Sequence, residues 1–69
     1  MTMGQSIKKI RKERGLTLLK LSEKSGVSTG TLLNWEKDYV MPTIFNLICV
    51  ADVFKVSLDE LVGREVRNR

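Results

Sequence analysis

The chain has 69 residues, 42% of them hydrophobic and 29% charged, which suits one small soluble domain and leaves no apolar run near the ~18 residues that a membrane span needs. With one cysteine, Cys49, and no histidine, an internal disulfide and most zinc or nucleophilic catalytic sites are excluded. Twelve basic against eight acidic residues give a net charge of +4, a balance that favours a polyanionic partner. The first residues carry no leader pattern, so we expect a cytoplasmic protein that binds no membrane, metal, cofactor or small-molecule substrate.

Helix starts along the chain share a local pattern: an apolar residue, then Ser or Thr, then three residues, then Leu. The hydroxyl of such a residue caps a helix, and the apolar residue before it packs on the leucine. The pattern predicts caps at Thr17, Ser28, Thr43 and Ser57. Gln5 lies three residues after Thr2, and Glu60 lies three residues after Ser57, which is the spacing of a capping box. Thr2 therefore marks a fifth helix start.

Glycines mark where helices end. Gly15, Gly26 and Gly63 follow helical patterns and can take the left-handed conformation that ends a helix. The predicted helices span residues 2–14, 17–25, 28–37, 43–54 and 57–62. No stretch alternates apolar and polar residues for long enough to predict a strand, so the fold class is all-α. We expect one domain over residues 1–63 and a basic tail over residues 64–69, which hold three basic residues and one acidic residue.

The connection between the second and third predicted helices is residues 25–28, Ser-Gly-Val-Ser. So short a connection suits a sharp turn at Gly26 that sets the helices roughly 90–120° apart, as in a helix-turn-helix. At about 100° per residue, Leu32 and Trp35 share the inward side of the third helix. The opposite side is largely small and polar and ends in a cation: Thr29, Gly30, Leu33, Asn34 and Lys37. Such a side suits a helix that enters the ~12 Å major groove of DNA and reaches base edges.

Further motifs lie at fixed distances from this turn. They are residues 10–17 leading into Leu21, Gly26-Val27-Ser28 followed by Thr31-Leu32 and Trp35-Glu36, then Pro42, Leu47, Ala51, Val56 and residues 57–61. With these motifs, residues 4–63 resemble the Cro/repressor-type (XRE-like) helix-turn-helix regulators of bacteria and their phages. The resemblance implies a compact five-helix DNA-binding domain whose third helix reads double-stranded DNA, usually as a homodimer on a partly palindromic operator. The implied function is that of a sequence-specific transcriptional regulator, a repressor rather than an enzyme.

The resemblance also implies roles for individual positions. The family's base-reading positions match Thr29, Gly30, Leu33 and Asn34. Its backbone-contacting positions match Thr17, Leu18, Thr31 and residues 37–43, among them Lys37, Tyr39 and Thr43. Its structural ion pair between the first and third helices matches Arg11 and Glu36, and helical spacing independently places both residues beside inward-facing ones.

Three positions depart from the family's pattern. Leu18 stands where the family commonly has a glutamine whose amide supports a phosphate contact. Asp38 stands where the family commonly has glycine; it tolerates a left-handed conformation but would add negative charge near the DNA. Gly30 offers no side chain to a base. We therefore expect modest sequence discrimination.

The fourth helix leaves two alternatives open. Its inward side consists of Leu47, Val50, Ala51 and Phe54. Phe45, Ile48 and Cys49 point away from that side and give more apolar surface than a monomer needs. Either the helix is covered on both sides, or part of it joins the outward Leu58 and Val62 of the fifth helix in a dimer contact.

Several residues near the third helix also have two interpretations. The spacing of Trp35 from Leu32 assigns Trp35 to the core rather than to base stacking. Tyr39 fits a phosphate contact and plain loop packing equally well. The basic residues of the first helix, Lys8, Lys9 and Lys12, fit a solvated helix face better than a phosphate-binding patch.

A second function fits the same fold. A protein-interaction module, antitoxin-like or anti-repressor, would use Leu18, Leu19, Leu33 and the fourth helix as apolar contacts and would bind DNA weakly or not at all. The two functions differ in their response to salt, because only a protein that neutralises phosphates loses DNA affinity steeply as the salt concentration rises.

Overall fold

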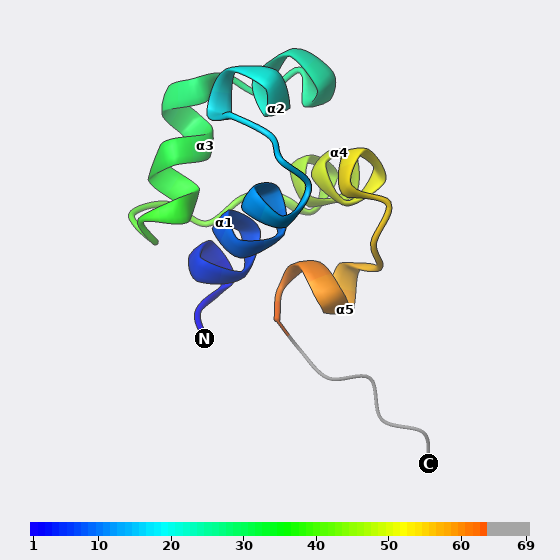
Figure 1. The fold of residues 1–69 in the computed structure, drawn as a ribbon. Coiled ribbons are helices and arrows are strands. Elements are labelled where there is room, and N and C mark those ends of the chain that lie inside the picture. Colours follow the sequence, from blue (N-terminus) through cyan, green and yellow to red (C-terminus); the bar gives the residue numbers. More distant parts are fainter. Residues whose placement is uncertain (64–69) are drawn as a thin grey trace.

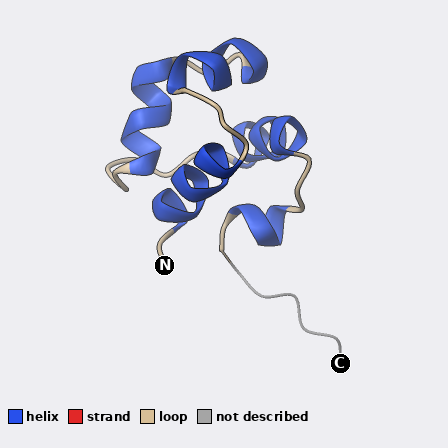
Figure 2. Ribbon diagram, viewed as in Figure 1, coloured by secondary structure: helices blue, strands red, loops and turns tan. Residues whose placement is uncertain are grey.

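The computed structural model describes residues 1–63, and this part of the chain contains five helices and no strand (Figure 1, Figure 2). The helices are α1 (Met3–Glu13), α2 (Leu18–Ser25), α3 (Thr29–Glu36), α4 (Ile44–Phe54) and α5 (Leu58–Leu61). The predicted all-α fold with five helices is confirmed. The tail predicted for residues 64–69 lies outside the described residues.

All five predicted caps are present, each immediately before the first residue of its helix. The hydroxyl groups of Thr2, Thr17, Ser28, Thr43 and Ser57 each accept a hydrogen bond from the backbone N–H three residues further on. Each helix starts one residue later than predicted because the cap residue itself has extended backbone angles. At the other end, α1, α3 and α5 stop one residue early, since Arg14, Lys37 and Val62 are C-cap residues.

A single apolar core joins the five helices. α1 packs against α3 and α5, α2 against α3 and α4, and α4 against α5. In Figure 1, α1 lies near the centre, with α3 above and to its left and α5 below and to its right. The core consists of Ile7, Ile10, Leu21, Val27, Leu32, Trp35, Leu47, Val50, Ala51, Phe54 and Leu61. Trp35 is only 2% exposed, which confirms its assignment to the core. None of the helices in residues 1–63 is long and apolar enough to cross a membrane.

The outer side of α4 is apolar and uncovered. Phe45 is 77% exposed, Ile48 is 42% exposed and the Cys49 thiol is free and exposed. Within residues 1–63, α4 is therefore not covered on both sides. On α5, Leu58 is exposed, whereas Val62 is half-buried and packs against the core. Val62 faces outward less than predicted because it is the C-cap of a one-turn helix rather than a residue on its outer side.

Candidate nucleic-acid interface

The turn between α2 and α3 has the sharp geometry that its sequence predicts. Gly26 has a left-handed φ of 78° and ends α2. The Ser25 hydroxyl donates to the carbonyl oxygen of Leu21 at 2.7 Å and accepts from the N–H of Val27 at 3.3 Å. Val27 then enters the core, and Ser28 caps α3. Local hydrogen bonds and one buried side chain thus fix the direction in which α3 leaves the turn.

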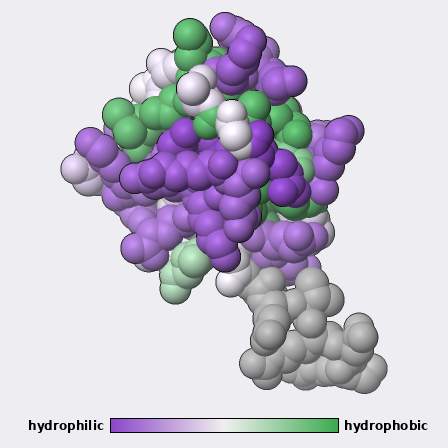
Figure 3. Space-filling model, in the orientation of Figure 1, coloured by the Kyte–Doolittle hydropathy of each residue, from purple (hydrophilic) through white to green (hydrophobic). Residues whose placement is uncertain are grey.

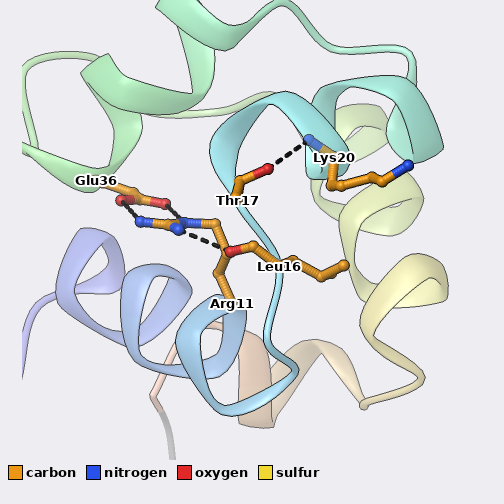
Figure 4. Close-up of polar contacts among 5 residues, drawn as sticks. All are labelled: Arg11, Leu16, Thr17, Lys20 and Glu36. Atoms are coloured by element: carbon orange, nitrogen blue, oxygen red, sulfur yellow. Dashed lines mark hydrogen bonds and ion pairs between the residues drawn. The ribbon is translucent and has the colours of Figure 1, made fainter.

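A buried ion pair holds the far end of α3. Arg11 donates through Nε to Oε2 of Glu36 at 2.7 Å and through Nη2 to Oε1 at 3.1 Å, and through Nη1 to the carbonyl oxygen of Leu16 at 2.8 Å (Figure 4). The side chains of Arg11 and Glu36 are 11% and 3% exposed. Since Leu16 immediately precedes Thr17, the cap of α2, one guanidinium connects α1, the start of α2 and the end of α3. The ion pair expected between Arg11 and Glu36 is present.

With its inward side in the core, α3 presents the opposite side to solvent. Thr29, Gly30, Leu33 and Asn34 are all exposed, and a Cβ atom on Gly30 would meet nothing within 4 Å. Thr31 is half-buried, and its hydroxyl accepts a hydrogen bond from the Ser28 hydroxyl at 2.8 Å. The outward side of α3 is thus open, and its short side chains leave room for another molecule.

The helix-turn-helix places α2 against α3, so the start of α2 is also part of the candidate interface. The Thr17 hydroxyl accepts from the N–H of Lys20 at 3.0 Å (Figure 4). Leu18 is half-buried and packs against the core, so its side chain is not free for the contact that the family's glutamine makes. The free backbone N–H groups in the first turn of a helix and the helix dipole attract anions.

The segment after α3 carries two more of the predicted residues. Asp38, with a φ of 59°, follows the C-cap Lys37 in a left-handed turn, which is closed by a hydrogen bond from the N–H of Tyr39 to the carbonyl oxygen of Asn34 at 2.9 Å. The Lys37 ammonium lies 5.8 Å from the centroid of the Tyr39 ring, within cation–π distance. The structure therefore brings Lys37 and Tyr39 together at the end of α3, while Thr43 lies further on as the cap of α4.

The Asp38 side chain reaches back to the start of α1. Its carboxylate accepts hydrogen bonds from the N–H of Gly4 and the hydroxyl of Thr2, at the start of α1. Sequence reasoning missed this role, because nothing in the local pattern of either segment points to the other.

The basic residues of α1 form a surface of their own. Lys8, Lys9 and Lys12 are exposed, and Figure 3 shows a hydrophilic surface over α1 in this view. These cations project from a different helix from the α3 residues described above. Their exposure agrees with a solvated helix face.

The comparison with known sequences points to one family. A helix-turn-helix family model matches residues 7–61. The immunity repressor protein of Bacillus phage phi105 is 42% identical over 65 residues, which are 94% of this chain and 45% of the phage protein. The HTH-type transcriptional regulator ImmR of Bacillus subtilis is 31% identical over 65 residues, which are 94% of this chain and 51% of ImmR. The chain thus spans about half the length of these relatives.

Solved structures show the same arrangement of helices. The P22 c2 repressor, in complex with a synthetic operator, superposes with a TM-score of 0.87 at 26% identity, over 94% of this chain and 98% of that one. SinR, a master regulator for biofilm formation in complex with DNA, superposes with a TM-score of 0.83 at 39% identity, over 87% of this chain and 97% of that one. Because the family model covers most of the chain and the fold agrees, the chain belongs to the Cro/repressor-type helix-turn-helix family.

Proposed function

We propose that this chain is a sequence-specific, double-stranded DNA-binding transcriptional regulator that acts as a repressor. The observation that carries the proposal is the outward side of α3, whose exposed Thr29, Gly30, Leu33 and Asn34 lie on a helix fixed from behind by the core and the buried Arg11–Glu36 pair. Its relatives support the proposal, since they include a phage immunity repressor and a repressor solved on its operator. As a regulator of this family the protein is not an enzyme, and it would act in the cytoplasm by occupying an operator and excluding polymerase or a competing regulator.

Base recognition falls to the exposed side of α3. The Asn34 amide has a donor and an acceptor at the end of a short side chain and can make two hydrogen bonds to adenine. Leu33 beside it can contact the methyl group of thymine. Thr29 can hydrogen-bond a base edge, and Gly30 lets the backbone approach the groove closely.

Phosphate contacts surround this reading surface. They come from the helix N-terminus at Thr17 and Leu18, from Thr31, and from Lys37, Tyr39 and Thr43 after α3. At Leu18 the backbone N–H replaces the side-chain amide that the family commonly offers. These contacts set orientation and overall affinity but carry no sequence information.

A homodimer would let two copies of α3 read the two halves of a partly palindromic operator. The surface that suits it is the uncovered apolar side of α4, with Phe45 and Ile48, together with Leu58 and the exposed part of Val62. An apolar area of this kind on a small domain is typical of a contact surface.

Selection of bound duplexes from a random pool tests DNA binding, base preference and half-site symmetry together. Binding should also weaken steeply with salt. Lys37→Ala should weaken binding, whereas Lys55→Ala, which removes the same charge at the left-handed C-cap of α4, should change it little. If the chain binds no duplex even at low salt, the DNA-binding function is wrong.

The second candidate, a protein-interaction module, rests on exposed apolar side chains. Leu19 is 61% exposed, Met41 is 69% exposed and Phe45 is 77% exposed. If the chain is such a module, Leu19→Ser and Phe45→Ser should each abolish binding of its protein partner. If it is a DNA-binding regulator, the Leu19→Ser variant should keep its affinity for a single half-site.

A further inference from the structure

The first turn of α1 lies directly against the last turn of α3. A Cβ atom on Gly4 would lie 2.7 Å from the backbone oxygen of Glu36 and 2.7 Å from Oδ1 of Asp38, and it would overlap the backbone oxygen of Trp35. The absence of a side chain at Gly4 thus allows the two helix ends to meet. Because a helix N-terminus carries partial positive charge and a C-terminus partial negative charge, these ends attract each other.

Asp38 connects the two helix ends through its side chain. Its Oδ1 accepts a hydrogen bond from the N–H of Gly4 at 2.9 Å, and its Oδ2 accepts one from the Thr2 hydroxyl at 2.6 Å. The Thr2 hydroxyl also accepts from the N–H of Gln5 at 3.1 Å. The cap of α1 and the residue that ends the α3 turn therefore belong to one hydrogen-bond network.

The backbone of Asp38 makes this side-chain contact more informative. Its φ of 59° lies in the left-handed region, where glycine is favoured over any residue with a side chain. A glycine would make the turn with less strain but could not bond to α1. The left-handed turn itself does not require a carboxylate. The carboxylate adds a link between the turn and α1.

Asp38 lies between the two residues that we assign to phosphate contacts after α3. We propose that Asp38 is a positioning residue for DNA binding: by holding the start of α1, it fixes the turn that presents Lys37 and Tyr39 to the phosphate backbone. This inference rests on the proposed function. It accounts for an acidic residue beside a DNA-binding surface, because the carboxylate is bonded to the start of a helix, where negative charge is favoured.

The variant Asp38→Gly separates positioning from simple electrostatics. Glycine takes the left-handed conformation without strain, so the fold should be retained. Removing a negative charge would by electrostatics alone strengthen DNA binding. If Asp38 positions Lys37 and Tyr39, the variant should instead bind duplex DNA roughly three- to tenfold more weakly, with a salt dependence shallower by about one unit.

Asp52→Asn is the charge-matched control, since Asp52 is an exposed residue of α4. It should bind DNA as well as the wild type or slightly better. Asp38→Gly binding that equals or exceeds that of the wild type would overturn the inference.

A double-mutant cycle tests whether Asp38 acts through its neighbours. In a chain that already carries Lys37→Ala and Tyr39→Phe, Asp38→Gly should cause no further loss of affinity, because the groups that it positions are gone. A loss as large as in the wild-type background would overturn the positioning role.

Measurements without DNA distinguish this inference from the proposed function. In Asp38→Gly, NMR relaxation should show greater mobility of the Lys37 and Tyr39 amides, and the Gly4 amide should exchange faster with solvent; Asp52→Asn should change neither. Unchanged mobility at Lys37 and Tyr39 would overturn the positioning role even in a chain that binds DNA. Failure of the wild-type chain to bind duplex at low salt would instead identify the proposed function as the step that is wrong.

Discussion

The Arg11 guanidinium connects three segments of the chain with one side chain. It bonds both carboxylate oxygens of Glu36 at the end of α3 and the carbonyl oxygen of Leu16 just before α2. Charged groups that are this buried are tolerated only while their partners are in place. The angle between α2 and α3 therefore depends on this charged pair as well as on apolar packing.

Glu36→Ala should destabilise the domain strongly, because it leaves the Arg11 charge buried without its partner. We expect a loss of about 3–5 kcal/mol in the free energy of unfolding, which should leave a domain this short largely unfolded even without urea. Glu23→Ala is the control: Glu23 pairs with Lys20 at 3.6 Å with both side chains more than half exposed, and such a pair is worth about 0–1 kcal/mol. Equal denaturation midpoints for the two variants would contradict a structural role for the buried pair.

Two glycines at the second position of a helix should respond oppositely to alanine. A Cβ atom on Gly4 would overlap backbone oxygens of α3, whereas one on Gly30 would meet nothing within 4 Å. Gly4→Ala should therefore cost about 1–3 kcal/mol, while Gly30→Ala should stabilise by up to ~1 kcal/mol through helix propensity. Thermal unfolding of the two variants checks the prediction, and a gain in stability in Gly4→Ala would show that the two helix ends lie further apart.

The helix features that could be predicted are those that depend on residues close together in the sequence. Each start is coded within four residues by a hydroxyl and the N–H that it caps, and all five caps are found. The inward sides of α3 and α4 follow from helical period, and both lie in the core. The remaining differences are one-residue shifts at ends, where cap residues leave helical geometry.

Contacts between distant segments are harder to predict. The bonds from Asp38 to Thr2 and Gly4 join residues 36 and 34 positions apart, and neither segment contains a motif that identifies the other. The Arg11–Glu36 pair could be predicted because the family resemblance matches both positions and helical spacing places each of them beside inward-facing residues. Its third bond, to the backbone of Leu16, has no sequence signal, since any residue supplies a carbonyl oxygen.

The inward side of α3 should be indispensable to the fold. Trp35→Ala removes a large side chain that is 2% exposed, a change that typically costs about 3–5 kcal/mol. A domain this short has a net stability of about 3–5 kcal/mol, so the variant should be largely unfolded by far-UV circular dichroism. Tyr39→Ala, at a position 73% exposed, should stay folded. A Trp35→Ala variant that melts near the wild-type temperature would contradict the assignment of Trp35 to the core.

For the molecule as a whole, dimer formation should matter only on DNA that offers two half-sites. Leu58→Ser removes an exposed apolar side chain from the proposed contact, so affinity for a two-half-site operator should fall by about tenfold, while affinity for a single half-site should not change. Titration of both duplexes measures the difference, with Leu19→Ser on α2 as the control. Equal wild-type affinity for one and two half-sites would contradict a dimer on DNA.

The whole binding surface should divide into residues that read sequence and residues that set affinity. Asn34→Ala should lose about 1–3 kcal/mol on the preferred operator and little on random duplex, because only a base contact is removed. Lys37→Ala should instead weaken binding to both duplexes and make the salt dependence shallower by about one unit, because one phosphate contact is lost. Titrations of each variant with both duplexes at several salt concentrations separate the two effects. If Asn34→Ala weakened both duplexes equally, Asn34 would not read a base; the specificity would then have to come from Leu33, Thr29 or the shape of the DNA.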